Sequence, residues 1–413
     1  TDTGYEYYVG WSDNRDWMTG SGIYAQKILA DGSLQWGPAG LVIADGSGDD
    51  QLNDVVEDYF IWHGGSWPNQ DIFVKRVDSD GSTAAGWPED GLLVCGATGF
   101  QENARGLMVP EGLLVVWEDK RSGTADLYGQ IITPEGQIVW AEDGIPLNAG
   151  VNDQIAARFL YDEYLYMVWE DFRSGIDEDI YMQKFDANGN ELWMAGGNEI
   201  IVADSAQTAP CLTKNSENYL VCWQASQSDA GTDLYGQLLN EQGEKLWAGS
   251  GYLICSAIKN QNKPQAVPVS NNMSVVIWQD TRSSGKTDIY NIYAQKLRMD
   301  LLSADDPVIP GNPFTLFQNY PNPFNPETTI AFNLPTGFSE DLTLDIFNLK
   351  GQKIRSYPVG NETGQTVENG QQLYSIIWNG CDHNGLPAAN GIYFYQLTSR
   401  YYQSPARKMI MLK

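Results

Sequence analysis

The sequence predicts an all-β protein in which a six-bladed β-propeller precedes an Ig-like β-sandwich. A tryptophan-centred segment recurs six times, every 51 to 55 residues, which is the length of a propeller blade. The period stops near residue 303, and the remaining 100 or so residues form short alternating runs between Gly and Pro turns, typical of a sandwich of about seven strands. The first tryptophans of the six copies are Trp11, Trp62, Trp117, Trp169, Trp223 and Trp278.

Each repeat is expected to contain four strands, which we call A to D. Strand A opens with Gln, strand B ends in the first Trp, strand C holds Asp-Ile/Leu-Tyr, and strand D holds a second Trp that follows the first by 23 to 25 residues in five copies. Four-stranded sheets arranged around an axis leave only short, protected edges. A propeller is therefore predicted over a β-solenoid, whose coils are shorter than 50 residues.

The two ends of the repeat array are incomplete. Repeat one begins directly with strand B at 5–11, and repeat six runs through strand C at 289–297 into the next segment without a strand D. The predicted ring therefore has an open seam, covered by residues upstream of Thr1, by the linker, or by a strand from another chain. The third case predicts a homo-oligomer formed by strand addition.

Three segments are predicted: a propeller over 1–302, an Asp/Pro/Gly-rich linker over 303–313 and the sandwich over 314–413. Because Thr1 is not an initiator Met, we expect a mature or partial product. No apolar stretch is long enough for a membrane-spanning helix. Cys211 and Cys222 fall on neighbouring strands of repeat five, and whether they pair is left open.

The charge limits the class of partner. The chain of 413 residues carries a net charge of −28, so nucleic acids and anionic membrane surfaces are disfavoured on electrostatic grounds. Cations, neutral glycans and other proteins remain as partners. The acidic residues are spread through the repeats, which favours a solubilising surface in a salty or extracellular medium.

The connection between strands B and C carries the motif Asp-x-Arg-Ser-Gly in repeats three and four, at 119–123 and 171–175. The Asp can accept backbone N–H groups in the turn, the Gly can take a positive φ, and the Arg can fork onto a carboxylate. We predict a structural clasp. The other interpretation, a repeated calcium site, leaves calcium as the one open cofactor, and repeat five lacks the motif.

Catalytic motifs are scarce. The chain has two His residues, His63 and His383, and no phosphate-binding Gly-rich loop, so a multi-His metal site or a Ser-His-Asp triad in the propeller is disfavoured. Carboxylate pairs remain open because their pairing depends on geometry. Three aromatic residues in B-to-C loops are candidate contacts for sugars or a protein partner, namely Trp17, Trp67 and Phe172.

Four motifs in the last 100 residues carry a resemblance: FTLFQNYPNPFNPETTIAFNLP, LDIFNLKGQKI, WNGCDHNGLPAANGIYFYQL and the terminal KMIMLK. In this order they resemble the C-terminal (type A) sorting domain of type IX secretion cargo, and are similar to the Ig-like domain of flagellar hook-capping proteins. The resemblance implies handling by the outer-membrane secretion machinery of a Gram-negative-type bacterium and an extracellular or outer-membrane-surface location. The implied signal residues are Tyr320, Pro321, Asn322, Pro323, Phe324, Asn325, Gly351, Gly391, Tyr393, Lys408 and Lys413.

The repeats resemble propeller repeats of secreted bacterial proteins, a resemblance that defines no activity. From the sequence we therefore expect a secreted or surface-displayed, non-enzymatic protein that serves adhesion, glycan or protein binding, or extracellular assembly. The alternative is an extracellular polysaccharide hydrolase with acids lining the propeller channel.

Overall fold

The computed structural model describes residues 6–15, 20–45, 49–66, 68–227, 231–247, 249–270, 272–282, 290–299, 315–335, 342–359, 365–367, 371–399, 404 and 406–412. Their regular secondary structure is all β, as predicted. The chain divides into two compact units, Thr1–Met299 and Asp300–Lys413. The predicted linker, 303–313, lies outside the described residues.

The first unit consists of six antiparallel sheets, one for each repeat. Sheets two to five have four strands in the order A-B-C-D, whereas sheet one has B-C-D and sheet six has A-B-C. In chain order the strands are β1 (Glu6–Asp13), β2 (Gly22–Leu29) and β3 (Leu41–Ala44); β4 (Gln51–Val56), β5 (Tyr59–Gly64), β6 (Asp71–Arg76) and β7 (Leu92–Cys95); β8 (Gln101–Val109), β9 (Gly112–Asp119), β10 (Asp126–Ile132) and β11 (Ile145–Asn148); β12 (Gln154–Asp162), β13 (Tyr164–Asp171), β14 (Asp179–Phe185) and β15 (Asn198–Ile201); β16 (Gln207–Asn215), β17 (Asn218–Gln227), β18 (Gly231–Leu239) and β19 (Tyr252–Cys255); and β20 (Gln261–Ser270), β21 (Met273–Asp280) and β22 (Asn291–Arg298).

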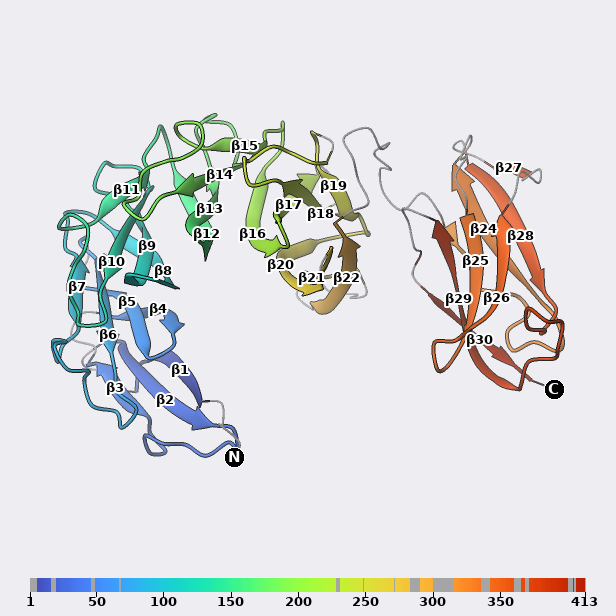
Figure 1. Cartoon of the computed structure of the whole chain (residues 1–413), viewed down its shortest axis with the longest axis horizontal. Coiled ribbons are helices and arrows are strands. Elements are labelled where there is room, and N and C mark those ends of the chain that lie inside the picture. The colour runs from blue at the N-terminus through green and yellow to red at the C-terminus, as the bar shows by residue number, and fades with distance from the viewer. Residues whose placement is uncertain are drawn as a thin grey trace. The chain divides into compact units, whose positions relative to one another are not determined.

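Within this unit the sheets follow one another face to face in an open arc, with the A strands β4, β8, β12 and β16 on its inner side and β7, β11 and β15 on its outer side (Figure 1). The cores lie between sheets. The core between sheets three and four, for example, joins Leu114 and Val116 of β9 to Met167 and Trp169 of β13. No repeat buries its apolar face alone, which is why the repeats stack.

In repeats one to five the first tryptophan packs against the loop that leads into strand D. Gly144 has a φ of 78° and lies directly over the Trp117 ring, so that a Cβ atom at this glycine would come within 2.4 Å of the indole. Gly197 stands over Trp169 in the same way, at 2.5 Å. Glycine is required at this position both for its backbone conformation and for the close approach.

The second tryptophan does not lie on strand D, and this part of the prediction was wrong. It precedes strand D in the connection from strand C: Trp140 lies before β11, and Trp247 before β19. From there the ring bridges to the next sheet, as where Trp87 Nε1 donates a hydrogen bond of 2.9 Å to Pro134 O. A connection can turn the indole sideways toward a neighbouring sheet, whereas a strand directs side chains only above or below its own sheet.

The six sheets do not close into a ring in this structure. Among the described residues, β1 has no partner on its inner edge and β22 none on its outer edge. Strand β22 is correspondingly exposed, with Ile292 70% accessible, whereas the equivalent strand β14 is buried along its whole length. The missing strand positions match the prediction, but the closed propeller is not what the structure contains.

The second unit has two four-stranded sheets around one core, which includes Phe324, Trp378, Tyr395 and Met411. One sheet has the order β23-β24-β28-β27 and the other β26-β25-β29-β30. The strands are β23 (Thr315–Leu316), β24 (Thr328–Pro335), β25 (Leu342–Asn348), β26 (Lys353–Val359), β27 (Gln365–Val367), β28 (Gln371–Trp378), β29 (Gly391–Ser399) and β30 (Arg407–Met411).

Candidate functional site

A β-bulge interrupts the inner strand of sheets three, four and five at the same place, two residues after its first Gln. The bulged residues Asn103, Ala156 and Ala209 have φ values of 57°, 56° and 51°, which is unusual for residues other than glycine. A bulge takes one residue out of the hydrogen-bond ladder and re-aims the side chains that follow it. It therefore leaves a backbone N–H without its ladder partner.

The preceding sheet accepts this N–H through the residue that follows its first tryptophan. Glu118 Oε1 accepts from Ala156 N at 2.9 Å, and Glu170 Oε1 accepts from Ala209 N at 2.8 Å. In the next sheet a glutamine does the same, because Gln224 Oε1 accepts from Lys263 N at 3.0 Å. We call this contact the inter-sheet hydrogen bond.

Glu118 and Glu170 are both buried, yet their Oε2 atoms differ in hydrogen bonding. Glu118 Oε2 accepts from Asn103 Nδ2 at 2.9 Å. The residue equivalent to Asn103 in the next sheet is Ala156, whose side chain has no donor, and Glu170 Oε2 has no hydrogen bond within the described part of the chain. Burial raises the pKa of both carboxyls, and that of Glu170 reaches about 7.

Two arginines follow the bulges, Arg105 on β8 and Arg158 on β12, each four residues after the first Gln of its strand. Burial, followed by the charge of Arg105, lowers the pKa of Arg158, while Glu170 and Glu118 act in the opposite direction. Strand β12 contacts both β8 and β9, so the two sheets bring two carboxyls and two guanidinium groups into one region, which we call the inner-strand cluster. It consists of Arg105, Glu118, Arg158 and Glu170.

Sequence reasoning missed this cluster. The available signal was the column that follows the first tryptophan when the six repeats are aligned. This column holds an acid in repeats three and four only, and the members are Ser12, His63, Glu118, Glu170, Gln224 and Gln279. That these two acids are buried beside arginines depends on the bulge and on the stacking of the sheets, which the sequence alone did not supply.

The Asp-x-Arg-Ser-Gly motif forms the predicted clasp. Asp171 is fully buried and accepts from Arg173 Nε at 2.8 Å, Arg173 Nη2 at 2.5 Å and the Arg173 backbone N–H at 2.9 Å. Trp169 Nε1 also donates to it, at 2.8 Å. In repeat five, where Ala225 replaces the Asp, Trp223 Nε1 donates to Gln207 instead. The Asp171 carboxylate thus forms its hydrogen bonds within the hairpin and serves a structural role.

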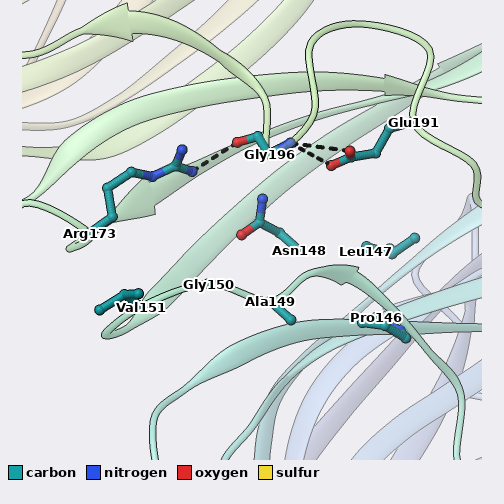
Figure 2. Close-up of a pocket in the computed structure, with 9 residues that line it drawn as sticks. All are labelled: Pro146, Leu147, Asn148, Ala149, Gly150, Val151, Arg173, Glu191 and Gly196. Carbon is teal, nitrogen blue, oxygen red and sulfur yellow. Dashed lines mark hydrogen bonds between the residues drawn. The ribbon is translucent and has the colours of Figure 1, made fainter.

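A pocket lies between the outer strand β11 and the loops of sheet four (Figure 2). Arg173 Nη2 donates to Gly196 O at 2.8 Å, and the backbone N–H of Gly196 donates to both oxygens of Glu191 at 3.1 Å. The amide of Asn148 points into the space between them. The charged groups here are occupied by the clasp and the loop, so the pocket offers fewer free groups than the inner-strand cluster.

Metal and thiol chemistry are the remaining possibilities. Across the described ranges, no group of three or more His, Cys, Asp or Glu residues is placed to hold a metal ion. The turn that resembles part of a calcium loop uses Asp186 to accept the backbone N–H groups of Asn188 and Asn190. Cys211 and Cys222 lie directly opposite one another in β16 and β17 and are free thiols in this structure.

Of the three aromatic candidates, Trp17 and Trp67 lie outside the described residues. Phe172 is half-buried; its backbone N–H donates to Asp153 O at 2.8 Å and its carbonyl accepts from Asn152 Nδ2 at 3.2 Å.

In the second unit the predicted signal residues meet from both ends of the domain. The backbone N–H of Phe324 donates to Ile410 O at 3.0 Å, and that of Leu412 donates to Phe324 O at 3.0 Å. The Phe324 ring packs against Trp378, and the side chain of Asn322 accepts from Ile410 N at 2.9 Å. The motif that contains Asn322 and Phe324 and the C-terminal strand β30 therefore form one structural element.

The other signal residues divide into buried and exposed ones. Tyr393 is buried against Trp378, and its hydroxyl donates to Ala389 O at 2.6 Å. Gly351 and Gly391 have φ values of 75° and 150°. Lys413 lies outside the described residues, and the exposed positions are Tyr320, Pro321, Asn322, Pro323, Asn325 and Lys408.

Residues 318–412 match the family described as "Secretion system C-terminal sorting domain". This match supports the resemblance to type IX secretion cargo, and the protein is accordingly secreted or located at the outer-membrane surface. The described residues contain no helix long and apolar enough to cross a membrane. No curated protein matches the chain in sequence.

Solved structures similar to this chain include three polysaccharide-degrading enzymes. An ulvan lyase of polysaccharide lyase family 25 is 9% identical, with coverage of 80% of this chain and 88% of the other and a TM-score of 0.49. A thermostable family-43 glycoside hydrolase is 11% identical, covering 64% and 95%, with a TM-score of 0.37. An endo-arabinase from Bacteroides thetaiotaomicron is 10% identical, covering 62% and 95%, with a TM-score of 0.34.

These findings correct the functional prediction. The sequence led us to expect a non-enzymatic binding or structural protein, and the similar structures are glycoside hydrolases and a polysaccharide lyase, which agrees with the alternative instead. At such identities and TM-scores the likeness assigns no role to any residue of this chain. The function has to be argued from the inner-strand cluster itself.

Proposed function

We propose that the first unit is an extracellular enzyme that cleaves glycosidic bonds in polysaccharide, with Glu118 and Glu170 as its catalytic carboxyls. The observation that carries this proposal is the placement of two buried carboxyls at equivalent positions of neighbouring sheets, one with both oxygens satisfied and one with a single oxygen satisfied. Glycoside hydrolysis needs two carboxyl groups in different protonation states. Unequal hydrogen bonding is one way to separate the pKa values of the two carboxyls.

The roles follow from the environments. Glu170 has a pKa of about 7, so near neutral pH a substantial fraction is protonated, and it serves as the general acid that gives its proton to the leaving glycosidic oxygen. Burial raises the pKa of Glu118 as well, but the hydrogen bonds on both of its oxygens, which Glu170 does not have, favour its ionised form. As the C–O bond breaks, water adds to the sugar carbon and gives its proton to Glu118.

A substitution separates catalysis from folding. Glu170→Gln keeps a carbonyl oxygen for the Ala209 N–H, as Gln224 does naturally toward Lys263, but it has no proton to transfer. We expect the release of reducing ends from a panel of plant, algal and bacterial polysaccharides to fall by about 10² to 10⁴ in this variant. Below pH 4.5, where Glu170 of the folded protein carries its proton, thermal unfolding should be unchanged.

The matched control is Gln224→Glu, which places a carboxyl at the same position of the next sheet and should not raise the rate. If Glu170→Gln cleaves as fast as the natural protein, Glu170 is not the acid and the proposal fails. If the natural protein releases no reducing ends from any polysaccharide of the panel, the hydrolytic reaction itself is refuted.

We further propose that the six sheets are the blades of a propeller that closes once strands occupy the free edges of β1 and β22, and that the second unit is an Ig-like sandwich. The support for closure is that sheets two to five share one strand order and pack face to face in one direction. A crystal structure of the secreted protein tests it: β1 and β22 should belong to neighbouring, completed blades, whereas an open arc would exclude the propeller.

A further inference from the structure

Arg105 and Arg158 stand apart from the other arginines of the first unit. Five of these form ion pairs with a carboxylate, as Arg76 does with Asp58 at 3.1 Å; they are Arg15, Arg76, Arg121, Arg173 and Arg282. Arg105 makes no hydrogen bond or ion pair with any described residue, and Arg158 donates only to the carbonyls of Ala156 and Ala157, at 3.4 and 2.8 Å.

Unpaired guanidinium groups are unexpected in a chain with 53 acidic and 25 basic residues. Pairing them with acids would be easy at this composition, yet neither forms an ion pair with a described residue. Strands β8 and β12, which carry the two arginines, are in contact. The charge of Arg105 disfavours the charged form of Arg158, while Glu170 and Glu118 act in the opposite direction. The guanidinium N–H groups that remain without a carboxylate partner can bind an anion.

Their accessibility fits a ligand from outside the protein. Arg105 is exposed and Arg158 is partly exposed, and both lie on inner strands, immediately after the bulges that set their direction. Val168 is the cross-strand partner of Arg158, and Glu170 follows Val168 by two residues. Glu170 and Arg158 therefore lie on the same face of sheet four. A group bound by the arginines would therefore lie beside the proposed acid.

We propose that Arg105 and Arg158 bind an anionic substituent of the substrate, so that the substrate is an acidic polysaccharide whose sugars carry a carboxylate or a sulfate ester. The inference rests on the proposed function in treating this ligand as the substrate, whereas the binding itself does not depend on catalysis. Guanidinium groups take either anion through paired N–H donors. The remainder of the acidic surface repels polyanions, which confines such a ligand to this cluster.

The test measures binding in the Glu170→Gln background, where cleavage does not interfere. The probes are polygalacturonate for a carboxylate, dextran sulfate for a sulfate ester and unmodified dextran as the neutral polymer. We expect one acidic polymer to bind, dextran not to bind, and Arg105→Ala/Arg158→Ala to weaken binding by about tenfold to a hundredfold, as for the loss of one to two charged hydrogen bonds. The polymer that binds identifies the anion.

The matched control is Lys350→Ala, which removes one positive charge from an exposed turn of the second unit and should bind like its parent. Equal binding by the double arginine variant overturns the inference, and so does binding of dextran as strong as that of both acidic polymers. Binding that depends on the arginines without cleavage of any polysaccharide keeps the inference and refutes the proposed function.

Discussion

Glu170 Oε1 accepts a hydrogen bond of 2.8 Å from the backbone N–H of Ala209, so one carboxyl connects the fourth sheet to a bulge in the fifth. The same carboxyl is the one that we propose as the general acid. Its structural role and its catalytic role use different oxygens. They also respond differently to substitution, which makes them separable.

The pH dependence of stability follows from this carboxyl. The folded-state pKa of Glu170 is about 7, above its ordinary value of 4.5, so the folded state binds the proton more tightly than the unfolded state. Its contribution to stability is complete below pH 4.5 and is lost as the pH rises through 7, by about 3 kcal/mol. Chemical denaturation at pH values from 4 to 8 should show this slope in the natural protein.

Glu170→Gln should lack that part of the slope while keeping the inter-sheet hydrogen bond. Glu170→Ala should also lack it, and should be less stable at every pH because the Ala209 N–H loses its acceptor, at a cost of about 1 to 3 kcal/mol. A natural protein and a Glu170→Gln variant with identical pH profiles would show that the carboxyl titrates normally.

The clasp predicts a second stability effect. Arg173→Ala leaves the buried Asp171 carboxylate without its guanidinium partner and should destabilise the first unit by about 1 to 3 kcal/mol, measured by chemical denaturation. Arg15→Ala is the matched control, because Arg15 donates to Asp13 through the same two nitrogens, Nε and Nη2, but at a solvent-exposed site. Its effect should be smaller. Equal losses, or loss of polysaccharide binding without loss of stability, would contradict the assignment of a structural clasp.

Export can be separated from folding of the sorting domain. Deletion of residues 408–413 removes Met409 and Met411 from the core of the second unit, so it should unfold that unit, leave the first unit folded and retain the protein inside the outer membrane. Tyr320→Ala changes a side chain that is 81% exposed and should leave the fold intact while reducing surface display.

Cell fractionation and circular dichroism of the purified variants report the two properties. Normal display of the deletion variant would refute the sorting role of the C-terminal strand. Normal display of Tyr320→Ala would remove that residue from the proposed signal.

The outer edge of β22, which has no partner strand in the part of the chain that the structure describes, predicts association. An exposed strand edge pairs with another strand, and head-to-tail pairing of copies gives rings or filaments. Light scattering across a concentration series should therefore detect a rise in mass, which Ile292→Lys on the edge should suppress. Ile176→Lys, at an isoleucine that is 80% exposed in a loop, should not. A monomer at every concentration would exclude strand donation between copies.

The sequence by itself determined the all-β class, the six repeats, the four-strand plan, the clasp and the resemblance to a sorting domain. Each of these rests on local information, since period, turn residues and short motifs are readable along the chain. The clasp could be predicted because Asp171 and Arg173 are two residues apart and need only one turn to meet.

Only the tertiary structure decided the position of the second tryptophan, the open arc and the inner-strand cluster. Glu118 and Ala156 are 38 residues apart and belong to different sheets, and their contact requires a bulge in one sheet that meets a strand end in the other. That Arg105 has no acid partner among the described residues is likewise a property of packing. Contacts between sheets depend on how the repeats stack, and no single repeat encodes this in its own pattern.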